Sequence, residues 1–469
     1  MPRTILHVNF SRSGGAGAVA KILQQEQTAH GHHANFHHVI DRDLRAQPFS
    51  SPRHTVAAGI DDAIIKSSKF DAPISLLRDR VAGPRLPQLS AIDIVHLHGI
   101  NGVFPRDVVE LLPQANKVVW TLHDMNPFTG ACHYSLGCNR FTEGCSGCPA
   151  VKPVFEKLVA EHWRRKSDFV DAISNLAIVA PSTWLAELAG ESPLLSDQNI
   201  SVQTNPIDPA FFARGRKSEK ATDPQTFRVV VVAKNLDDPV KNVAQTVSAF
   251  TEAFGTSLRF QLLLAGRGGA SFVSPNIVLL GEQSSSELAE VFSTADLLVV
   301  SSLAENAPLV IAEAASQGCP SFVANVGGMP EMVDLLGAGE VFSATTELVE
   351  LLRADAEDAE DHREKARLSL KAAASRVFSP ETVVKGYDKV YSSKFWSPAP
   401  PDSLVLRLRR RSACRDTVLS QWMLCLVDCI QRMKKRLASK CWPTSMASTP
   451  TTSICATMTF LSFPPISRT

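Results

Sequence analysis

The chain has 469 residues, 44% of them hydrophobic and 20% charged, a composition typical of globular proteins with two or three domains. Its formal net charge of +1 excludes a strongly basic nucleic-acid-binding protein, so we expect no nucleic-acid partner. The charge is unevenly distributed, because residues 402–469 carry 11 Lys and Arg against 3 Asp, which leaves the preceding chain mildly acidic.

The cysteines and apolar runs favour a cytoplasmic protein. Four of the ten cysteines lie within residues 132–148 and the first hundred residues contain none, whereas a secreted disulfide framework spreads its cysteines through a small domain. The N-terminal residues show no secretory signal pattern, and no apolar run reaches the ~18 residues that span a bilayer.

Strand and helix patterns alternate along the first half of the chain. The sequence predicts a strand at 4–10, a glycine turn at 14–17 and a helix at 18–28, which together open a doubly wound α/β unit. Further strands are predicted at 92–97, 117–122 and 176–180, with helices at 104–112 and 152–173.

A second alternating series follows a polar segment at 213–226. Its predicted strands lie at 227–233, 258–265, 297–300 and 320–324, and its helices at 243–254, 285–293 and 308–317. Continuous apolar strands between helices indicate buried parallel sheets with right-handed crossovers. The predicted fold class is therefore α/β, with two Rossmann-like domains that face a cleft.

These series set the predicted domain boundaries. They are an N-terminal domain at 1–212 with a cysteine-rich insert at 132–148, a linker at 213–226, a C-terminal domain at 227–379, a last helix at 380–398 and a basic tail at 399–469. The tail contains no Glu. We interpret it as non-globular and as an out-of-frame product; the alternative is an amphipathic membrane-surface helix at 417–437.

The glycines at 14–17 suit a nucleotide. They let backbone N–H groups and a helix N-terminus approach a diphosphate. Gly15-x-Gly17-x-x-Ala20 also fits the dinucleotide fingerprint, with Asp41 as the ribose acid, so an NAD-dependent oxidoreductase stays open here. A tight turn would explain the same glycines without any ligand.

Two carboxylates mark the second series. Glu305 lies in a loop after a buried strand, and Glu313 lies eight residues farther on, in the helix that follows. Carboxylates in such positions can accept hydrogen bonds from sugar hydroxyls. A second flexible loop is expected at 326–331, and ligands bind at these strand ends in open α/β sheets.

Several motifs, in this order, resemble those of retaining glycosyltransferase family 4, which has the GT-B fold. They are Val95-His96-Leu97-His98-Gly99, Thr121-Leu122-His123-Asp124-Met125, Pro181-Ser182, Asn205-Pro206-Ile207-Asp208 and the Glu305–Glu313 pair. The resemblance covers roughly residues 4–393. It is strongest to the bacterial polysaccharide-building branch, which carries a Thr-Leu-His-Asp-Met-x-Pro-Phe-Thr-Gly segment.

The resemblance implies roles for residues of the second series. Glu313 would hold the nucleotide ribose and Glu305 the donor sugar, assisted by the backbone of Asn306, Ala307, Pro308 and Leu309. Lys241 would contact the diphosphate, although Asn242 replaces the family's usual glycine after it. Lys234 is a weaker match to a family arginine, and a solvated charge is the alternative for either lysine.

In the first series the resemblance places Gly15 and Gly17 beside the donor and His123 near the reacting sugar. A buried structural histidine is the alternative for His123, and we expect His96 and His98 to be structural. Two other patterns are expected to be empty: Asp41-Arg42-Asp43 as a solvated turn, and the histidines at 30, 32, 33, 37 and 38 as the exposed end of a helix and its following strand.

The cysteine-rich insert is a candidate structural metal site. Cys132, Cys138, Cys145 and Cys148 end in a Cys-x-x-Cys pair, and four thiolates can bind zinc tetrahedrally. The spacing of the first pair is not that of a standard zinc knuckle. We expect a staple of the loop, by zinc or by packing of reduced thiols, and not a catalytic centre.

The resemblance implies an enzyme that needs no metal for catalysis and transfers a sugar with retention. The donor would be a UDP- or GDP-linked sugar, and the acceptor a saccharide or lipid-linked sugar at the cytoplasmic membrane face, in polysaccharide or cell-envelope biosynthesis. The alternatives are a GT-B binding or scaffold protein without turnover and, less favoured, the oxidoreductase.

Overall fold

The computed structural model describes residues 2–11, 14–40, 92–100, 115–213, 226–357 and 360–393, together with Gly59, Asp61, Ile64 and residues 73–76. These residues form two six-stranded sheets, and all strand pairings within the sheets are parallel. The predicted α/β class is confirmed. Both sheets belong to one compact unit within residues 1–399.

Several predictions fall outside the described residues. They include the helix at 104–112, almost all of the linker at 213–226 and the whole tail at 399–469 with its segment 417–437. The same is true of Asp41, Arg42 and Asp43. The domain boundaries therefore stay predictions, although each sheet has a core of its own.

The N-terminal sheet has the strand order β2-β1-β3-β4-β5-β6. Its strands are β1 (Thr4–Ser11), β2 (His33–Ile40), β3 (Ile92–Leu97), β4 (Ala115–Thr121), β5 (Leu176–Ala180) and β6 (Ile200–Val202), and its helices include α1 (Gly15–Ala29), α4 (Glu156–Asp171) and α5 (Thr183–Glu191). The three-residue β6 was not predicted, because so short a strand gives almost no periodic signal.

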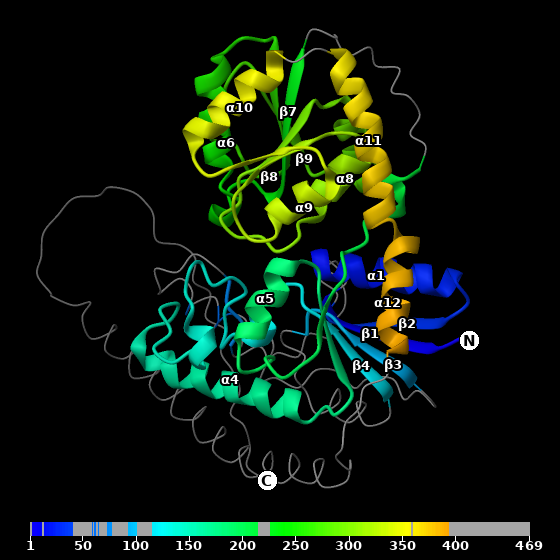
Figure 1. Cartoon of the computed structure of the whole chain (residues 1–469). Coiled ribbons are helices and arrows are strands. Elements are labelled where there is room, and N and C mark those ends of the chain that lie inside the picture. Colours follow the sequence, from blue (N-terminus) through cyan, green and yellow to red (C-terminus); the bar gives the residue numbers. More distant parts are fainter. Residues whose placement is uncertain are drawn as a thin grey trace, which may run out of the picture. The chain divides into compact units, whose positions relative to one another are not determined.

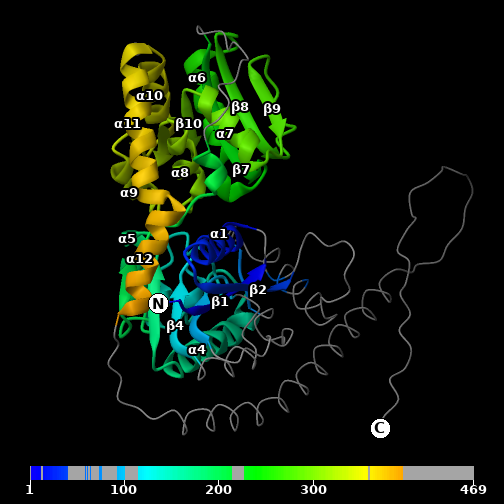
Figure 2. The same ribbon diagram turned by 90° about the vertical axis from the view of Figure 1, so that its right-hand side faces the viewer.

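The C-terminal sheet has the order β12-β11-β10-β7-β8-β9. Its strands are β7 (Phe227–Asn235), β8 (Phe260–Arg267), β9 (Ile277–Gly281), β10 (Leu297–Val300), β11 (Ser321–Ala324) and β12 (Glu340–Phe342). Its helices are α6 (Val243–Phe254), α7 (Ser285–Thr294), α8 (Leu309–Ser316), α9 (Met329–Leu336), α10 (Thr345–Glu357) and α11 (Glu360–Phe378), and Figure 2 shows α10 and α11 together on one side of it.

One predicted loop is partly helical. The flexible loop expected at 326–331 is a short turn at Gly327 and Gly328 that leads directly into α9 at Met329. Pro330 lies in the first turn of α9, where a missing backbone N–H costs nothing. The proline that suggested a loop therefore starts a helix.

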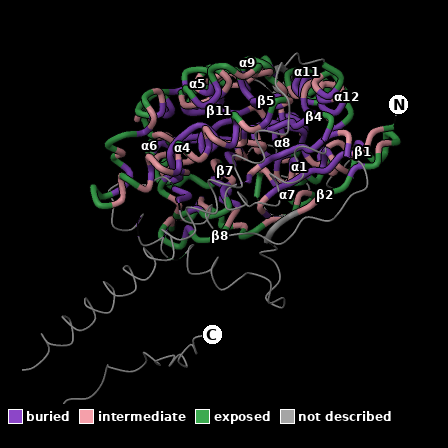
Figure 3. The backbone as a smooth tube through the Cα atoms, turned by 90° about the horizontal axis from the view of Figure 1, so that it is seen from below, coloured by how far each residue is buried: buried purple, intermediate pink, exposed green. Residues whose placement is uncertain are grey.

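Buried apolar side chains form separate cores around the two sheets. Strands such as β5 and β11 are buried along their whole length, as their purple colour in Figure 3 shows. One core cluster contains the side chains of the C-terminal sheet, and two clusters flank the N-terminal sheet. Burial on both faces explains why these strands read as continuous apolar runs.

The last described helix, α12 (Pro380–Ser392), packs on the N-terminal sheet although it follows the C-terminal sheet in sequence. Figure 1 shows it beside α1. Val383, Tyr387 and Tyr391 are buried there, and the Lys117 ammonium of β4 donates to the backbone oxygens of Val390 and Ser393 at the end of α12. The terminal helix thus closes the N-terminal core.

None of the described helices is long and apolar enough to cross a membrane.

Each sheet has one point where the strand order reverses. In the N-terminal sheet this point lies between β1 and β3, and in the C-terminal sheet between β7 and β10. The segments that leave neighbouring strands there diverge to opposite faces, and ligands bind in the crevice between them. These strand ends are therefore where a ligand site is expected.

Candidate functional site

Lys241 and Glu305 meet at the reversal point of the C-terminal sheet. Lys241 ends a short 3-10 turn after β7, and Glu305 lies in the loop after β10. The Lys241 ammonium donates to Oε1 of Glu305, which also accepts a hydrogen bond of 3.2 Å from the Ser302 hydroxyl. Glu305 is only 7% exposed, so its charge depends on this partner. The structure brings together two residues that lie 64 positions apart.

Asn242 gives the loop the shape that a glycine would give. Its φ of 50° and ψ of 38° are left-handed, a conformation that asparagine adopts more readily than most residues. The hydroxyl of Ser301 donates to the Asn242 carbonyl over 2.9 Å and accepts from Thr246 over 2.9 Å. The departure from the family's glycine therefore leaves Lys241 in place.

Gly327 is needed where its loop crosses that of Glu305. Its φ is 64°, and a Cβ atom at this position would lie 1.7 Å from the backbone oxygen of Glu305. The neighbouring Gly328 donates its N–H to the same oxygen over 3.3 Å. The two glycines thus hold the backbone of Glu305 in one position.

Glu313 lies on the second turn of α8 and differs from Glu305 in having no cation beside it. Among the described residues, its carboxylate has no hydrogen-bond or ion-pair partner. Burial raises its pKa to about 7, and the nearby charge of Asp208 adds to the shift. Asp208 itself accepts hydrogen bonds from the N–H of Ala210 and the hydroxyl of Ser285. A carboxylate kept half-buried and unpaired is suited to accept hydrogen bonds from a ligand.

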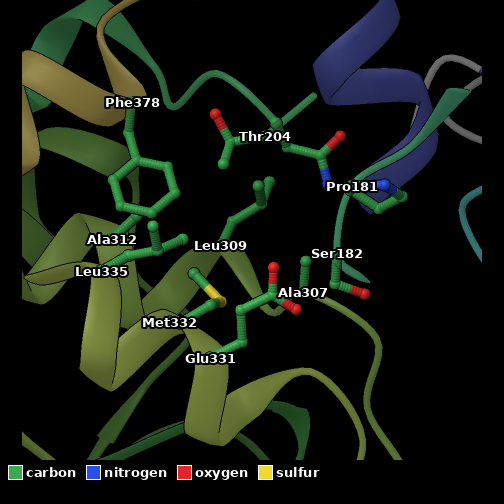
Figure 4. Close-up of a pocket in the computed structure, with 11 residues that line it drawn as sticks. Pro181, Ser182, Thr204, Ala307, Leu309, Ala312, Glu331, Met332, Leu335 and Phe378 are labelled. Carbon is green, nitrogen blue, oxygen red and sulfur yellow. The ribbon is translucent and has the colours of Figure 1, made fainter. Parts of the chain in front are cut away.

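The N-terminus of α8 lies between the two glutamates. Asn306 is buried, Pro308 is the N-cap and Leu309 begins the helix, as predicted within one residue. The first N–H groups of a helix lack intrahelical partners and carry a partial positive charge. Ala307 and Leu309 also line a pocket with Ser182 and Glu331, which Figure 4 shows.

The glycine segment differs from the expectation. Helix α1 begins at Gly15 and not at residue 18, so Gly15 and Gly17 lie in its first turn. Gly14, with φ 89°, is the residue that needs glycine's conformational freedom. Among the described residues, no atom lies within 4 Å of a Cβ atom placed at Gly14 or Gly15. Packing against this part of the chain therefore does not require a glycine at Gly15.

Lys234 lies apart from the pair formed by Lys241 and Glu305. It is exposed near the end of β7, and no hydrogen bond or ion pair reaches its ammonium from the described residues. The expectation that it contacts the donor stays a prediction, and of the two lysines only Lys241 is held beside Glu305.

Four histidines gather at the reversal point of the N-terminal sheet, and three of them form a hydrogen-bonded chain. Nδ1 of His7 lies 3.0 Å from Nε2 of His98, and Nδ1 of His98 lies 3.0 Å from Nε2 of His123. His96 stacks on His98 with 4.1 Å between ring centroids. Burial lowers the pKa of His7 and of His123 to about 4 and those of His96 and His98 well below the usual range. All four rings are therefore neutral at pH 7.

His7, His96 and His98 form a candidate metal cluster among the described residues. Each ring offers a nitrogen that lies within 4.8 Å of a nitrogen of the other two rings. Each of their six nitrogens, however, already has a hydrogen-bond partner, supplied by the neighbouring histidines or by Gln27, Thr121 and Tyr391. A metal ion would have to break this network, so the cluster is better explained as neutral and hydrogen-bonded. His96 and His98 are structural in this sense, as expected.

Asp124 is the charged residue next to this chain. Burial alone would raise its pKa, but the charge and hydrogen bond of His133, with a further hydrogen bond from the N–H of Asn126, lower it. His133 Nδ1 lies 2.6 Å from Oδ2 of Asp124, and its Nε2 lies 2.9 Å from the Ser75 hydroxyl. The Asp124 carboxylate thus contacts the His133 ring directly, whereas the Nε2 of His123 is directed to His98.

Hydrogen bonds join the strand ends of the two sheets. The Ser182 hydroxyl donates to Oδ1 of Asn306 over 2.7 Å, and Nδ2 of Asn306 donates to the carbonyl of His123 over 3.3 Å. Asn306 follows Glu305 directly, so these contacts place the His123 backbone beside the loop of the two glutamates. The predicted site residues His123 and Glu305 therefore belong to one region.

Sequence reasoning assigned no role to Glu331 or Tyr134. The Glu331 carboxylate of α9 accepts hydrogen bonds of 2.9 and 2.7 Å from the N–H of Thr183 and one of 3.3 Å from that of Trp184, and thereby caps α5.

Tyr134 belongs to the cysteine-rich insert. Burial raises its pKa well above the usual value, and the charges of Glu305 and two aspartates add to this shift. The spacing of the cysteines gave no indication that this tyrosine lies within the electrostatic range of Glu305.

The four cysteines of the insert are reduced. Burial raises the pKa of Cys132 to about 12 and that of Cys145 to about 11, so both are thiols at pH 7. The Cys145 sulfur accepts a 3.0 Å hydrogen bond from the N–H of Gly130. The described residues that gather three ligand atoms within 4.8 Å are histidines and not these cysteines. A zinc ion would require the sulfurs to move closer together, and the zinc site stays a prediction.

Residues 227–354 match the family model described as Glycosyl transferases group 1. The matched range runs from β7 into α10 and contains Lys241, Glu305 and Glu313. The C-terminal half of the compact unit therefore carries a group 1 glycosyltransferase domain.

Two curated proteins have similar sequences. The chain is 27% identical over 411 residues to N-acetyl-alpha-D-glucosaminyl L-malate synthase of Bacillus anthracis, across 81% of this chain and 93% of that protein. It is 27% identical over 234 residues to WcaC of Escherichia coli K12, which is named for a glycosyl transferase of colanic acid biosynthesis. This second match spans 48% of the chain and only about half, 56%, of the relative.

Solved structures share the fold. A glycosyltransferase from Rickettsia africae superimposes with a TM-score of 0.54 at 13% identity, over 83% of this chain and 98% of that one. Anabaena Alr3699/HepE in complex with UDP gives a TM-score of 0.50 at 15% identity, over 83% and 100% of the two chains. At these identities the likeness establishes the fold, which is GT-B, as the sequence predicted.

Proposed function

We propose that this chain, which carries a group 1 glycosyltransferase domain, transfers a sugar from a nucleotide-sugar donor to a hydroxyl group of an acceptor, with retention of configuration. The observation that carries the proposal is the arrangement of Lys241, Glu305 and Glu313 around the N-terminus of α8. An NAD-dependent oxidoreductase would have no use for this arrangement.

The donor's diphosphate would lie between Lys241 and the first N–H groups of α8. A departing nucleoside diphosphate gains negative charge, which an ammonium group and a helix dipole can stabilise because both are in position before the reaction. The proposal needs no catalytic metal for this reason. Glu313 would accept hydrogen bonds from the ribose, and Glu305, held by Lys241 and Ser302, would contact the sugar.

The acceptor would approach from the side of His123. By analogy with retaining enzymes of this fold, its hydroxyl attacks on the face that the diphosphate leaves, and the leaving phosphate takes the proton. This route requires no protein base, which agrees with a neutral His123 whose lowered pKa makes it a hydrogen-bond partner rather than a cation.

Two classes of acceptor have support from the relatives' names. WcaC is named for colanic acid biosynthesis, which favours a saccharide or lipid-linked acceptor in envelope polysaccharide synthesis. The Bacillus anthracis relative is named for L-malate, a small hydroxy acid. We favour the saccharide class, acting in the cytoplasm or at the inner membrane face, because the sequence also resembles the polysaccharide-building branch. Transfer to L-malate but to no saccharide would overturn this choice.

The nucleotide is tested by calorimetric titration of the full chain with UDP, GDP, ADP and NAD. Anabaena HepE was solved with UDP and with UDP-glucose, so we expect UDP to bind, with GDP as the alternative. Glu313→Ala should weaken the binding of the nucleotide that is preferred. Binding of NAD alone would contradict the proposal. Nucleotide binding with neither transfer nor donor hydrolysis would favour a scaffold protein.

We also propose that the four cysteines of the insert bind a structural zinc ion. All four lie within residues 132–148, the segment ends in a Cys-x-x-Cys pair, and the thiols are free rather than joined in disulfides. Metal analysis of freshly purified protein should then find about one zinc per chain, released by chelator. Protein that contains no zinc and keeps its stability after chelation would exclude the metal and leave packing of reduced thiols.

A further inference from the structure

We propose that Gln27, His7 and His98 act as positioning residues that fix which ring nitrogen of His123 carries the proton. The inference rests on the proposed function in one respect: it supposes that a substrate hydroxyl meets the ring of His123. It concerns residues that neither the resemblance nor the relatives assign to the reaction.

The four side chains come from neighbouring elements of the N-terminal sheet. Gln27 lies on α1 and His7 on β1, while His98 and His123 follow the ends of β3 and β4. Since β1, β3 and β4 are adjacent, residues near their carboxyl ends lie side by side. Oε1 of Gln27 lies 2.7 Å from Nε2 of His7, and two further contacts of 3.0 Å complete the chain to His123.

The chain has a direction because each neutral imidazole has one donor and one acceptor nitrogen. The amide oxygen of Gln27 can only accept, so Nε2 of His7 donates to it. Nδ1 of His7 then accepts from Nε2 of His98, and Nδ1 of His98 accepts from Nε2 of His123. Nδ1 of His123 is left without a proton, as an acceptor.

Nδ1 of His123 is the free end of this chain. It has no hydrogen-bond partner among the described residues, and the ring is partly exposed. Its backbone carbonyl is held by Asn306, beside Glu305. An unprotonated Nδ1 can accept a hydrogen bond from a sugar hydroxyl, whereas a protonated one would repel the same hydroxyl hydrogen.

The orientation of Gln27 is set from α12. Nε2 of Gln27 donates to the Tyr391 hydroxyl over 3.0 Å, and this hydroxyl donates to Nδ1 of His96 over 2.8 Å. His96 then donates from Nε2 to the Thr121 hydroxyl over 2.7 Å. Turning the Gln27 amide would reverse every donor in both branches. An intermediate arrangement would oppose two donors or two acceptors in the core, which is costly.

Tyr391 and Tyr387 provide a matched pair of variants. Both are buried on α12 and both have a hydrogen-bonded hydroxyl, but only Tyr391 contacts Gln27; Tyr387 contacts Thr121 over 2.9 Å. Tyr391→Phe should therefore release the Gln27 amide, whereas Tyr387→Phe removes a comparable buried hydrogen bond without releasing it. A purely structural role of the network would make the two variants alike.

The experiment measures the histidine tautomers of the full chain by two-bond ¹H–¹⁵N NMR correlation after selective ¹⁵N-histidine labelling. In the unsubstituted protein, His7, His98 and His123 should all carry the proton on Nε2. Gln27→Met and Tyr391→Phe should move part of the His123 population to the Nδ1-protonated form, and Tyr387→Phe should not. His162, whose Nδ1 contacts the Gly130 carbonyl over 2.6 Å outside this chain, should keep its tautomer in every folded variant.

Protonation of Nδ1 of His123 in the unsubstituted protein would overturn the proposal, as would an unchanged His123 in Gln27→Met and Tyr391→Phe. These signals need no substrate, so they remain decisive if the protein transfers no sugar. Where transfer is observed, the kcat of each variant should be lower the larger its fraction of Nδ1-protonated His123 is. A protein with the expected tautomers and no transfer would contradict only the proposed function.

Discussion

The two sheets contribute different kinds of polar group to the candidate site. On the C-terminal side, Glu305 is paired with Lys241, whereas the half-buried Glu313 has no cationic partner among the described residues. On the N-terminal side, His7 and His98 are buried, His123 is partly exposed, and the three neutral rings form one hydrogen-bonded chain. Fixed charges suit a diphosphate, whereas a neutral wall suits hydroxyl groups and an oxocarbenium-like sugar that a cation would destabilise.

This difference shows how one fold can divide a reaction between its halves. Charges on the C-terminal side must be compensated within the protein or by the ligand, so their removal should have large effects. On the N-terminal side, the direction of the hydrogen bonds fixes the histidine tautomers, so substitutions there should change these tautomers. The following predictions test this division.

The largest effect is expected at the charged pair. Lys241→Met should lower the rate of sugar transfer by about 10²–10³-fold, because it removes the ammonium that would stabilise the leaving diphosphate. The rate is measured by nucleotide release at saturating donor. Lys234→Met is the matched control, since Lys234 is exposed and near the same strand end. An equal loss of transfer rate in the two variants would show that Lys241 has no special role.

Next is the loop that supports Glu305. Gly327→Ala should lower the free energy of unfolding by about 3 kcal/mol or more, because its Cβ would collide with the backbone oxygen of Glu305. Gly337→Ala has nearly the same φ, 66° against 64°, and open space around it, so it should cost only about 1 kcal/mol. Denaturant midpoints at constant m-value measure both. A similar loss of unfolding free energy in both variants would show that the positive φ, and not the collision with Glu305, causes the loss.

Glu313 should make stability depend on pH. Its pKa is raised from 4.5 to about 7, so the folded protein holds this proton more tightly than the unfolded chain does. The resulting stabilisation is complete below pH 4.5 and is lost as the pH rises through about 7. Glu313→Gln should remove this dependence and raise the free energy of unfolding at pH 8 by up to about 3 kcal/mol. Glu340→Gln, at an exposed position, should leave the pH profile unchanged.

The smallest effect is expected at Glu331. Glu331→Gln removes the negative charge from the N-terminus of α5 but keeps one acceptor oxygen, so it should cost about 1 kcal/mol. Thermal unfolding at low and high salt separates charge from hydrogen bonding, and the loss should shrink at high salt. Glu287→Gln, which changes an exposed capping box within α7, is the control. A loss independent of salt would assign Glu331 a packing role.

Much of the C-terminal sheet could be predicted from the sequence. The strand at 297–300 and the helix at 243–254 have the predicted bounds, because apolar runs of strand length and amphipathic helices leave strong periodic signals. Strands β9 and β12 and helices α9, α10 and α11 were not predicted. Strand β12 has only three residues, and Gly and Pro at the start of α9 suggest a loop. The pair of Glu305 and Glu313 was recognised because both lie in one short segment.

The amino-acid sequence by itself determined the α/β class, the alternation of strands and helices in two series, and the acidic, lysine and histidine residues available to the site. Local periodicity and glycine chemistry are properties of short segments, and a reader of the sequence sees them directly. Only the tertiary structure decided that Lys241 pairs with Glu305, that Glu331 caps a helix 148 residues away, and that Tyr391 reaches His96 across 295 residues. Such contacts depend on which strands become neighbours and on how deeply each polar group is buried. Burial then sets the pKa of Glu313 and the neutrality of the histidines, which no local pattern contains.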